Sequence, residues 1–279
     1  MLTAKTNVRC YRFEGGRCQS IETQAITEIS ITLAVNGEDW LALMCTPLDM
    51  EALAVGFLFN EGLIHSKNEV ASVRVCPTGD NVDVWLTHAV EKPKQWRRTS
   101  GCTGGVTSVP NEKNTAESIS RPVLGEVRLS PEQVTALVSQ LFASQDLYQT
   151  AGGVHTSALS DGKRILIAAE DIGRHNTLDK IAGRCLLDGI NPLQRVLITT
   201  GRVSSEMMQK AARIGASVVI SRTAPSSLSI EIADQSGITL IGYARRDQFT
   251  VYCHPERVVD AHAGEPACVE TEPVIEAQA

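Results

Sequence analysis

One cysteine stands in a segment whose composition suits a reactive sulfur atom. Cys102 lies within residues 99–105, Thr-Ser-Gly-Cys-Thr-Gly-Gly, and three glycines around one thiol are typical of an exposed, mobile loop. The nearest large side chains are Trp96, Arg97 and Arg98, and the two positive charges favour thiolate over thiol. The pattern predicts a reactive cysteine. The competing interpretation is a flexible linker that happens to contain a thiol.

The remaining cysteines show no pattern of a preformed metal site. The eight cysteines are Cys10, Cys18, Cys45, Cys76, Cys102, Cys185, Cys253 and Cys268. No C-x-x-C or similar close pair occurs among them, so neither a zinc nor an iron–sulfur site is expected. Cys45, Cys185 and Cys253 have apolar or helical surroundings that fit unreactive packing thiols in a reducing cytoplasm.

Polar loops precede or follow several predicted strands and form a second candidate site. They share glycines, hydroxyls and charges, and they cover residues 152–156, 170–176, 200–202 and 221–227. Sheets flanked by helices bind ligands at such strand ends. Helix N-termini beside Arg202 and Arg222 favour an anionic, phosphorylated ligand. Each loop taken alone is also explained by ordinary helix capping, but the three loops that follow strands share one sheet edge and weaken that explanation.

His155, His175, Glu170 and Asp171 could instead form a catalytic or metal-binding set. The zinc deaminase signature fails, because Ser157 stands two residues after His155 and no Pro-Cys-x-x-Cys follows. The alternative is that both histidines are hydrogen-bonded structural residues.

The first part of the chain is predicted to be a small α+β unit that positions Cys102 at its end. Residues 9–43 alternate as an antiparallel ribbon with a turn at Asn36-Gly37. Thr46 is expected to cap a helix that has Pro47 at its first position and stops at Gly62. Strands are expected at residues 70–75 and 82–86.

The sequence pattern changes after residue 130, where segments typical of helices alternate with segments typical of strands. Ser130-Pro131 begins a helix with apolar residues at helical spacing. The expected strands are residues 165–169, 195–199, 216–220, 238–243 and 249–253, and the expected helices between them are residues 176–187, 204–214 and 226–233. This alternation predicts a three-layer α/β domain.

Length and composition set the domain organisation. The 279 residues favour two domains, with residues 1–110 as the N-terminal α+β domain, 111–127 as a linker, 128–255 as the α/β domain and 256–279 as an acidic, disordered tail. Six acids and one arginine give that tail −5 of the total charge of −6. The chain has no excess of basic residues of the kind that binds nucleic acid. It also has no apolar run long enough for a membrane span and no apolar segment of a secretion signal near residue 1, so a cytoplasmic location is expected.

Taken together, the motifs resemble the FdhD/NarQ family of formate dehydrogenase accessory proteins. The segments that carry the resemblance are Gly152-Gly153-Val154-His155, residues 170–180 (Glu-Asp-Ile-Gly-Arg-His-Asn-Thr-Leu-Asp-Lys), residues 200–207 (Thr-Gly-Arg-Val-Ser-Ser-Glu-Met) and residues 221–225 (Ser-Arg-Thr-Ala-Pro). The resemblance runs from about residue 25 to 255. It implies a cytoplasmic sulfur carrier that takes persulfide sulfur from a cysteine desulfurase and passes it to the molybdenum of a bis(molybdopterin guanine dinucleotide) cofactor, for a formate dehydrogenase catalytic subunit. It also implies a second domain similar to the cytidine deaminase fold, without zinc.

The resemblance places roles on particular residues. It puts the persulfide on Cys102, and Gly105 stands where many members carry a second cysteine. Its cofactor-contacting segment falls on Tyr243, Ala244, Arg245, Arg246, Asp247 and Gln248. The strand-end loops add Gly152, Gly153, Gly201, Arg202, Ser221 and Arg222 as candidate cofactor-binding residues. A cofactor with two guanine halves favours a homodimer with paired pockets.

Two rival functions stay open at this point. One is a degenerate nucleoside-processing enzyme that uses His155 or His175 with Glu170, which turnover of free nucleosides would reveal. The other is a chaperone that only holds the cofactor, in which Cys102 would not matter.

Overall fold

The computed structural model describes residues 2–94, 96–98, 106–108, 127–193 and 195–259. The expected linker at residues 111–127, apart from Val127, and all of the tail after residue 259 lie outside these ranges, as does Cys102. No helix in the described part of the chain is long and apolar enough to cross a membrane.

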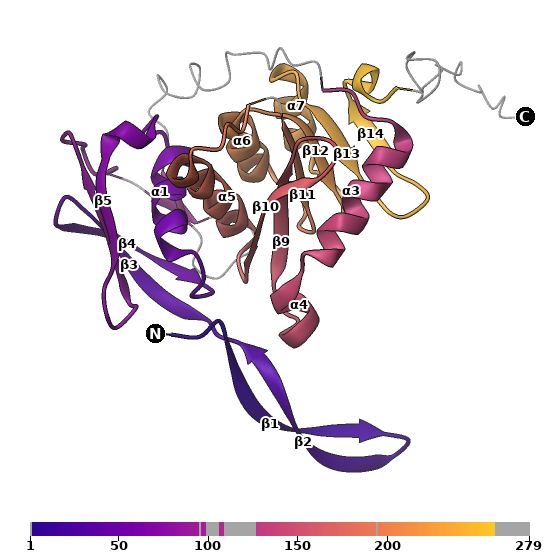
Figure 1. Cartoon of the computed structure of the whole chain (residues 1–279), viewed down its shortest axis with the longest axis horizontal. Coiled ribbons are helices and arrows are strands. Elements are labelled where there is room, and N and C mark those ends of the chain that lie inside the picture. Colours follow the sequence, from indigo (N-terminus) through magenta and orange to yellow (C-terminus); the bar gives the residue numbers. More distant parts are fainter. Residues whose placement is uncertain (1, 95, 99–105, 109–126, 194, 260–279) are drawn as a thin grey trace, which may run out of the picture.

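The N-terminal unit is a four-stranded sheet preceded by a separate two-stranded hairpin (Figure 1). The hairpin strands are β1 (Lys5–Glu14) and β2 (Arg17–Ile26). The sheet has the order β4-β3-β6-β5, with β3 (Ile29–Val35), β4 (Glu38–Cys45), β5 (Val70–Val75) and β6 (Asn81–Leu86). Among its described residues, this unit also has the helix α1 (Met50–Asn60) and a short 3-10 helix (Lys67–Glu69).

The predicted turn between β3 and β4 is confirmed, whereas the predicted start of the first helix is wrong. Asn36 and Gly37 both have positive φ, 51° and 82°, as a tight two-residue hairpin requires. Helix α1 begins at Met50 after Asp49, not at Pro47 after Thr46. Thr46 is buried and uses its backbone and hydroxyl groups to bond the second unit, so it is not free to cap a helix.

The C-terminal unit is built on one six-stranded sheet of order β10-β9-β11-β12-β13-β14. Its strands are β9 (His155–Ser160), β10 (Ile165–Asp171), β11 (Arg195–Thr199), β12 (Ala216–Ser221), β13 (Thr239–Gly242) and β14 (Thr250–Cys253). Its helices are α3 (Pro131–Ala143), α4 (Asp146–Ala151), α5 (Arg174–Asp188), α6 (Ser205–Ile214) and α7 (Ser227–Gln235). The predicted alternation is confirmed, but the sequence did not indicate α4 or β9.

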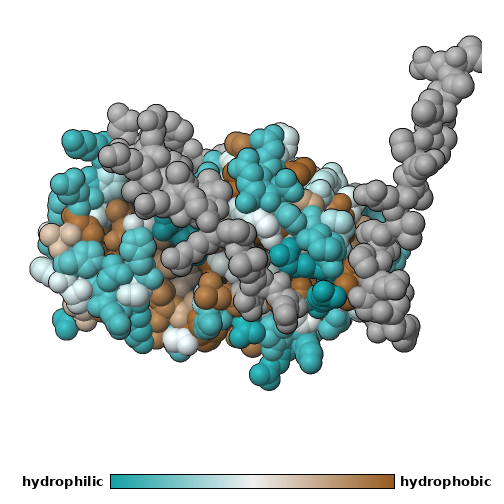
Figure 2. All heavy atoms as spheres, turned by 90° about the horizontal axis from the view of Figure 1, so that it is seen from above, coloured by the Kyte–Doolittle hydropathy of each residue, from teal (hydrophilic) through white to brown (hydrophobic). Residues whose placement is uncertain are grey.

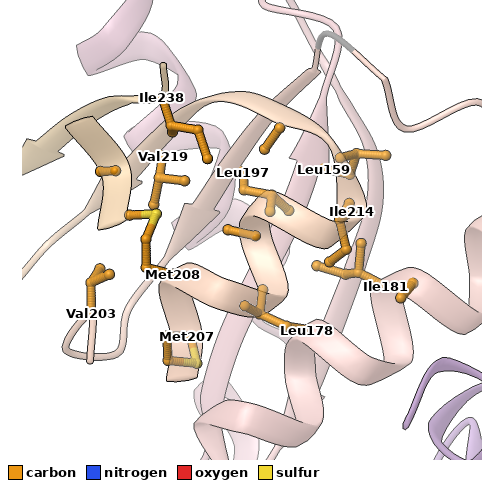
Figure 3. Packing of buried hydrophobic residues seen from close by; sticks show 14 of the residues in the cluster. Leu159, Leu178, Ile181, Leu197, Val203, Met207, Met208, Ile214, Val219 and Ile238 are labelled. Atoms are coloured by element: carbon orange, nitrogen blue, oxygen red, sulfur yellow. The ribbon is translucent and has the colours of Figure 1, made fainter. Parts of the chain in front are cut away.

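Helices cover both faces of this sheet, which makes it α/β. Alternate strand residues point to opposite faces: Leu159 and Leu197 lie in the hydrophobic cluster with Leu178 of α5 and Met208 of α6 (Figure 3). Their neighbours, such as Val196, lie in the cluster of α3 on the other side. On the face that Figure 2 shows, hydrophobic residues lie in groups among hydrophilic ones.

The two units meet along α1 and α5. Every residue of α1 from Ala52 to Leu58 is buried, because one side of the helix faces its own sheet and another faces α5. The two helices cross at Gly56 and Gly183, and a Cβ on either glycine would overlap backbone of the opposite helix. Close approach at this crossing therefore requires glycine at both positions.

The folded chain continues past the expected start of the tail at residue 256. Val258 is 2% exposed, and Leu129 and Val258 form a β-bridge, with the N–H of Val259 donating to the carbonyl oxygen of Leu129 (3.0 Å). The α/β unit therefore extends to Val259 rather than ending at residue 255.

Candidate functional site

The strand-end loops that were expected to form a site meet at one edge of the six-stranded sheet. Strands β11, β12 and β13 are mutually parallel, and β9 is antiparallel to both β10 and β11. Strands β10 to β13 therefore all finish at the same edge, where β9 starts. Residues 152–153, 201–202, 221–222 and 243–248 follow or precede these strand ends. We call this the loop edge.

Hydrogen bonds tie these loops to one another. The Thr200 N–H donates to the Thr156 carbonyl (3.0 Å), and the Arg222 N–H donates to Thr199 (3.2 Å). The Ser221 hydroxyl donates to the Gly201 carbonyl (2.9 Å), while the Ala244 N–H donates to the Ser221 carbonyl (3.0 Å). The backbone positions of the loop edge are thus fixed relative to one another.

The candidate residues divide into buried and exposed members. Ser221 and Ala244 are fully buried and hold neighbouring loops together. The exposed members are Gly153, Arg202, Arg222, Tyr243, Arg245, Arg246, Asp247 and Gln248. Tyr243 is 45% exposed and has φ +50°, an uncommon backbone conformation for a residue with a side chain.

Arg222 has a partner that sequence reasoning missed. Its guanidinium lies over the ring of Phe142, 4.3 Å from the ring centroid, a cation–π geometry that orients the arginine while leaving its edge available. Phe142 follows Leu141 in the predicted apolar face of α3. The aromatic ring of Phe142 was the available signal for a cation–π partner, but Arg222 lies 80 positions later in the sequence.

Three helices begin at or beside the loop edge, two of them with a serine cap. The Ser204 hydroxyl accepts from the Met207 N–H at α6, and Ser226 does the same for Ser229 at α7. Helix α5 begins after Gly173 without a side-chain cap. N–H groups at helix N-termini attract anions, so the loop edge combines such groups with the exposed charges of Arg202 and Arg222.

The two histidines lie beneath the loop edge and are electrically neutral at pH 7. Burial, followed by repulsion from Arg174, lowers the pKa of His155. Burial and the charges of Lys210 and Arg174 lower the pKa of His175 to about 3. The His175 Nε2 lies 3.3 Å from the Ser204 hydroxyl. Arg174, which the sequence did not single out, packs beneath Gly201.

Both carboxylates of the alternative catalytic set make structural bonds. Glu170 accepts the N–H groups of Leu147 and Tyr148 (2.7 and 3.0 Å) and so holds the start of α4. Asp171 pairs with Lys180 at 2.7 Å, and both side chains are fully buried. Among the described residues, no group of three or more His, Cys, Asp or Glu side chains comes together as a metal site would.

Asp171 also joins the two units. It accepts the backbone N–H of Thr46 (3.1 Å), and Lys180 donates to the Thr46 carbonyl (3.2 Å). A second buried pair, Asp179 with Lys210 at 2.6 Å, bonds Asn60 of α1 in the same way (2.7 Å). These pairs fasten the N-terminal unit against the unit that carries the loop edge.

The predicted sulfur-bearing residue lies between two short paired strands. Strand β7 (Trp96–Arg98) pairs antiparallel with β8 (Val106–Ser108), with Arg98 opposite Val106. Residues 99–105, which include Cys102, connect these strands and lie outside the described residues. The role of Cys102 therefore stays a prediction.

The fold is that of an α/β protein, and its candidate site is a sheet edge where helix N-termini and exposed arginines lie together. A sequence model of the FdhD/NarQ family matches residues 26–259, and this chain belongs to that family. Relatives include the sulfur carrier protein FdhD of Bacillus subtilis (strain 168), 36% identical over 89% of this chain and 95% of the relative.

Other comparisons agree. The sulfur carrier protein FdhD of Staphylococcus aureus (strain MRSA252) is 34% identical over 90% of this chain and 95% of the relative. A crystal structure described as a formate dehydrogenase accessory protein from Desulfotalea psychrophila is similar, with a TM-score of 0.77 and 29% identity. That similarity covers 92% of this chain and all of the other.

Proposed function

We propose that this protein is a sulfur carrier that matures a formate dehydrogenase. In this proposal Cys102 receives sulfur from a cysteine desulfurase and delivers it to a molybdenum bis(molybdopterin guanine dinucleotide) cofactor before that cofactor enters the catalytic subunit of the dehydrogenase. The observation that carries the proposal is membership of a family whose curated relatives are sulfur carriers. The helix N-termini and exposed arginines of the loop edge support it, because such groups suit a phosphorylated ligand.

The first step is a thiolate exchange in which atoms and charge balance. The Cys102 thiolate attacks the outer sulfur of the desulfurase persulfide, a new S–S bond forms on Cys102, and the desulfurase cysteine leaves as a thiolate. No oxidant is consumed. Neighbouring Arg97 and Arg98 favour the attacking thiolate. The absence of a second cysteine at Gly105 means that the step uses one thiol of that loop.

The cofactor, which is the cargo of the reaction, fits the chemistry of the loop edge. Phosphate oxygens suit backbone N–H groups at helix N-termini and the guanidinium groups of Arg202, Arg222, Arg245 and Arg246. Tyr243 offers an exposed ring for stacking against a base. The buried Ser221 and Ala244 then act by holding the loops, as do the backbone turns at Gly152, Gly153 and Gly201. Asp247 and Gln248 are exposed and can accept hydrogen bonds from a guanine edge.

Further parts of the proposal concern the setting of this chemistry. We propose that the second unit is similar to the cytidine deaminase fold, without its zinc chemistry. We also propose that the protein is cytoplasmic and forms a homodimer with two loop edges. A dimer suits a ligand with two guanine nucleotides, because occupancy of both pockets in one binding event raises affinity through effective concentration.

The rival functions make different use of the same residues. The nucleoside-processing alternative needs Glu170 as an acid or base, but its carboxylate already accepts two N–H groups at α4. The chaperone alternative shares the loop edge and differs only in giving Cys102 no role.

The deciding experiment follows sulfur on the purified protein. Incubation with a cysteine desulfurase and cysteine is expected to add the mass of one sulfur atom, and peptide mapping is expected to place it on Cys102. Cys102→Ala should lose both the added mass and maturation of the dehydrogenase while keeping its melting temperature. Cys18→Ala, which removes an exposed thiol elsewhere, is the matched control. Normal maturation by Cys102→Ala would leave the chaperone function in place of the carrier.

A further inference from the structure

One buried carboxylate at the loop edge bonds groups of both units. Asp171 is the last residue of β10 and is fully buried. Its Oδ1 accepts the N–H of Gly173 (2.7 Å) and the side-chain amide of Asn176 (2.8 Å). Its Oδ2 accepts the N–H of Thr46 (3.1 Å) and pairs with the ammonium group of Lys180 (2.7 Å). A carboxylate offers about four acceptor positions, and these four bonds fill them.

The bonds to Oδ1 determine where α5 begins. Gly173 stands directly before the first turn of α5, and no side chain caps it. A bond from Asp171 to the N–H two residues later turns the chain sharply out of the strand. Asn176 belongs to the first turn of α5, and its bond to the same oxygen holds that turn against the end of β10. The position of the first turn therefore depends on Asp171.

The same cluster bonds the chain that leaves β4 in the N-terminal unit. The Asn176 amide also donates to the carbonyl oxygen of Met44 (2.8 Å), so the two units share its two hydrogens. The hydroxyl of Thr46 accepts the N–H of Ile172 (3.2 Å). Figure 1 shows α5 beside α1, between the N-terminal sheet and the six-stranded sheet. The start of α5 is thus held on one side by β10 and on the other by the N-terminal unit.

His175 lies in that first turn and has an atom to which a ligand can bind. It is 3% exposed, and its Nε2 lies 3.3 Å from the hydroxyl of Ser204 at the start of α6. Its Nδ1 is buried and has no hydrogen-bond partner among the described residues. Because Nδ1 is bonded to the ring carbon that carries Cβ, it stays close to the first turn of α5. A buried polar atom without a partner is costly, and a phosphate of the proposed cargo can supply that partner.

Lys180 makes a carboxylate at this place compatible with an anionic ligand. A negative charge is attracted to the N-terminal end of a helix, so an unneutralised Asp171 would compete with the ligand for the start of α5. The side chain of Lys180 is fully buried beside Asp171 and offsets its charge. Asp171 therefore serves as an acceptor of hydrogen bonds and leaves the attraction of the helix start for an anion in place.

We infer that Asp171 and Asn176 are positioning residues of the loop edge, which place the first turn of α5 for ligand binding by bonding it to the N-terminal unit. The N-terminal unit thereby completes the site through Thr46, which is fully buried and does not touch the ligand. This inference rests on the proposed function, since it takes the loop edge as the site of the cargo. It adds that affinity for the cargo depends on the contact between the units.

The test is calorimetric titration of the full-length protein and three variants with GDP. Asn176→Ala and Asn60→Ala are a matched pair, because each removes an amide that bonds a buried, lysine-paired aspartate where the units meet. The partner of Asn60 is Asp179, which lies further along α5 than the first turn. Asn176→Ala should raise the dissociation constant about tenfold, as loss of one hydrogen bond to a charged group does. Asn60→Ala should lower the melting temperature but leave the affinity unchanged.

Thr46→Val tests the part played by the N-terminal unit. It keeps the shape of the side chain but removes the hydroxyl that accepts the Ile172 N–H. Because this change lies in the other unit and away from the ligand, a merely local role of Asn176 would not reproduce its effect. Thr46→Val should also weaken GDP binding, by about threefold to tenfold, as loss of one ordinary hydrogen bond does.

Hydrogen exchange of the peptide that covers residues 172–178 gives a second readout, which does not need a ligand. Thr46→Val and Asn176→Ala should speed exchange in this peptide more than Asn60→Ala does. Wild-type affinity and exchange in both variants overturn the inference, and so does an equal loss of affinity in Asn60→Ala. A wild type that binds no GDP contradicts the proposed cargo instead, and exchange in the three variants then decides by itself whether the N-terminal unit positions the first turn.

Discussion

His175 is expected to make the protein less stable in mild acid, and His175→Gln should remove part of that sensitivity. The imidazole is 3% exposed, and its Nδ1 is a buried atom without a hydrogen-bond partner among the described residues. The charged groups around it are Arg174 on its own helix and Lys210 and Glu206 on α6, and the two cations outweigh the one acid.

The direction of the effect follows from proton binding in the two states. The pKa of His175 is about 3 in the folded protein and about 6.5 in the unfolded chain. Between these values the unfolded state holds the proton and the folded state does not, so the free energy of unfolding falls as the pH falls below about 6.5. At pH 5 the loss relative to pH 7 is about 2 kcal/mol, from 1.36 kcal/mol per pH unit.

Urea denaturation of wild type and His175→Gln at pH 7, 6 and 5 measures this effect. The wild type should lose about 2 kcal/mol more than the variant between pH 7 and pH 5. His88→Gln is a control of opposite sign, because hydrogen bonds to the Ala89 carbonyl and to Glu69 raise the pKa of that exposed histidine. Its contribution is present in acid and is lost as the pH rises. Equal pH dependence of wild type and His175→Gln would refute the reasoning.

Three further predictions test other parts of the molecule. Gly183→Ala should cost about 3 kcal/mol of unfolding free energy, because the new methyl group meets backbone of α1 that cannot rotate away; chemical denaturation measures it. Removing residues 260–279 should leave the melting temperature unchanged, whereas a truncation that also removes the buried Val258 should cost about 2 kcal/mol. Arg222→Ala should weaken GDP binding about tenfold, since a charge-assisted hydrogen bond contributes about 1.5–3 kcal/mol; calorimetry measures it.

The controls use changes at matched positions. Gly189→Ala replaces a glycine at the end of α5 that has open space around it, so any loss there reflects its positive φ alone. Arg164→Ala removes an exposed arginine at the opposite edge of the sheet and should leave GDP binding unchanged. Equal binding of ATP and GDP would contradict a guanine-specific pocket, and a large fall in melting temperature after removal of residues 260–279 would show that the tail packs against the body.

The sequence predicted the parallel part of the sheet well and failed on the strand beside it. Runs such as residues 195–199 and 216–220 are continuous and apolar between turn signals, as buried parallel strands are. Strand β9 contains Thr156, Ser157 and Ser160, all fully buried. Their hydroxyls bond inside the protein, as Ser157 does with Thr199 (2.9 Å). A run of serine and threonine residues is typical of a loop in the sequence, and only the hydrogen-bond partners of their hydroxyl groups explain why this strand is buried.

The candidate site was predictable as loops but not as a network. Glycine and hydroxyl residues after predicted strands indicated the loop edge. Strands that alternate with helices run parallel, and the ends of parallel strands meet at one edge of the sheet. The buried pairs of Asp171 with Lys180 and Asp179 with Lys210 were not predictable, since isolated charges are expected at the surface. Their bonds to Thr46 and Asn60 span more than 100 positions of sequence.

The crossing of α1 and α5 has a consequence for how the protein comes apart. The glycine contact and the buried lysines cannot be separated without exposing apolar surface and unpaired charges, so neither unit is complete without the other. Heat should therefore melt both units in one calorimetric transition. For the same reason we expect the two units to stay associated when the chain is cut within residues 109–126. Co-expressed halves should likewise assemble into one particle.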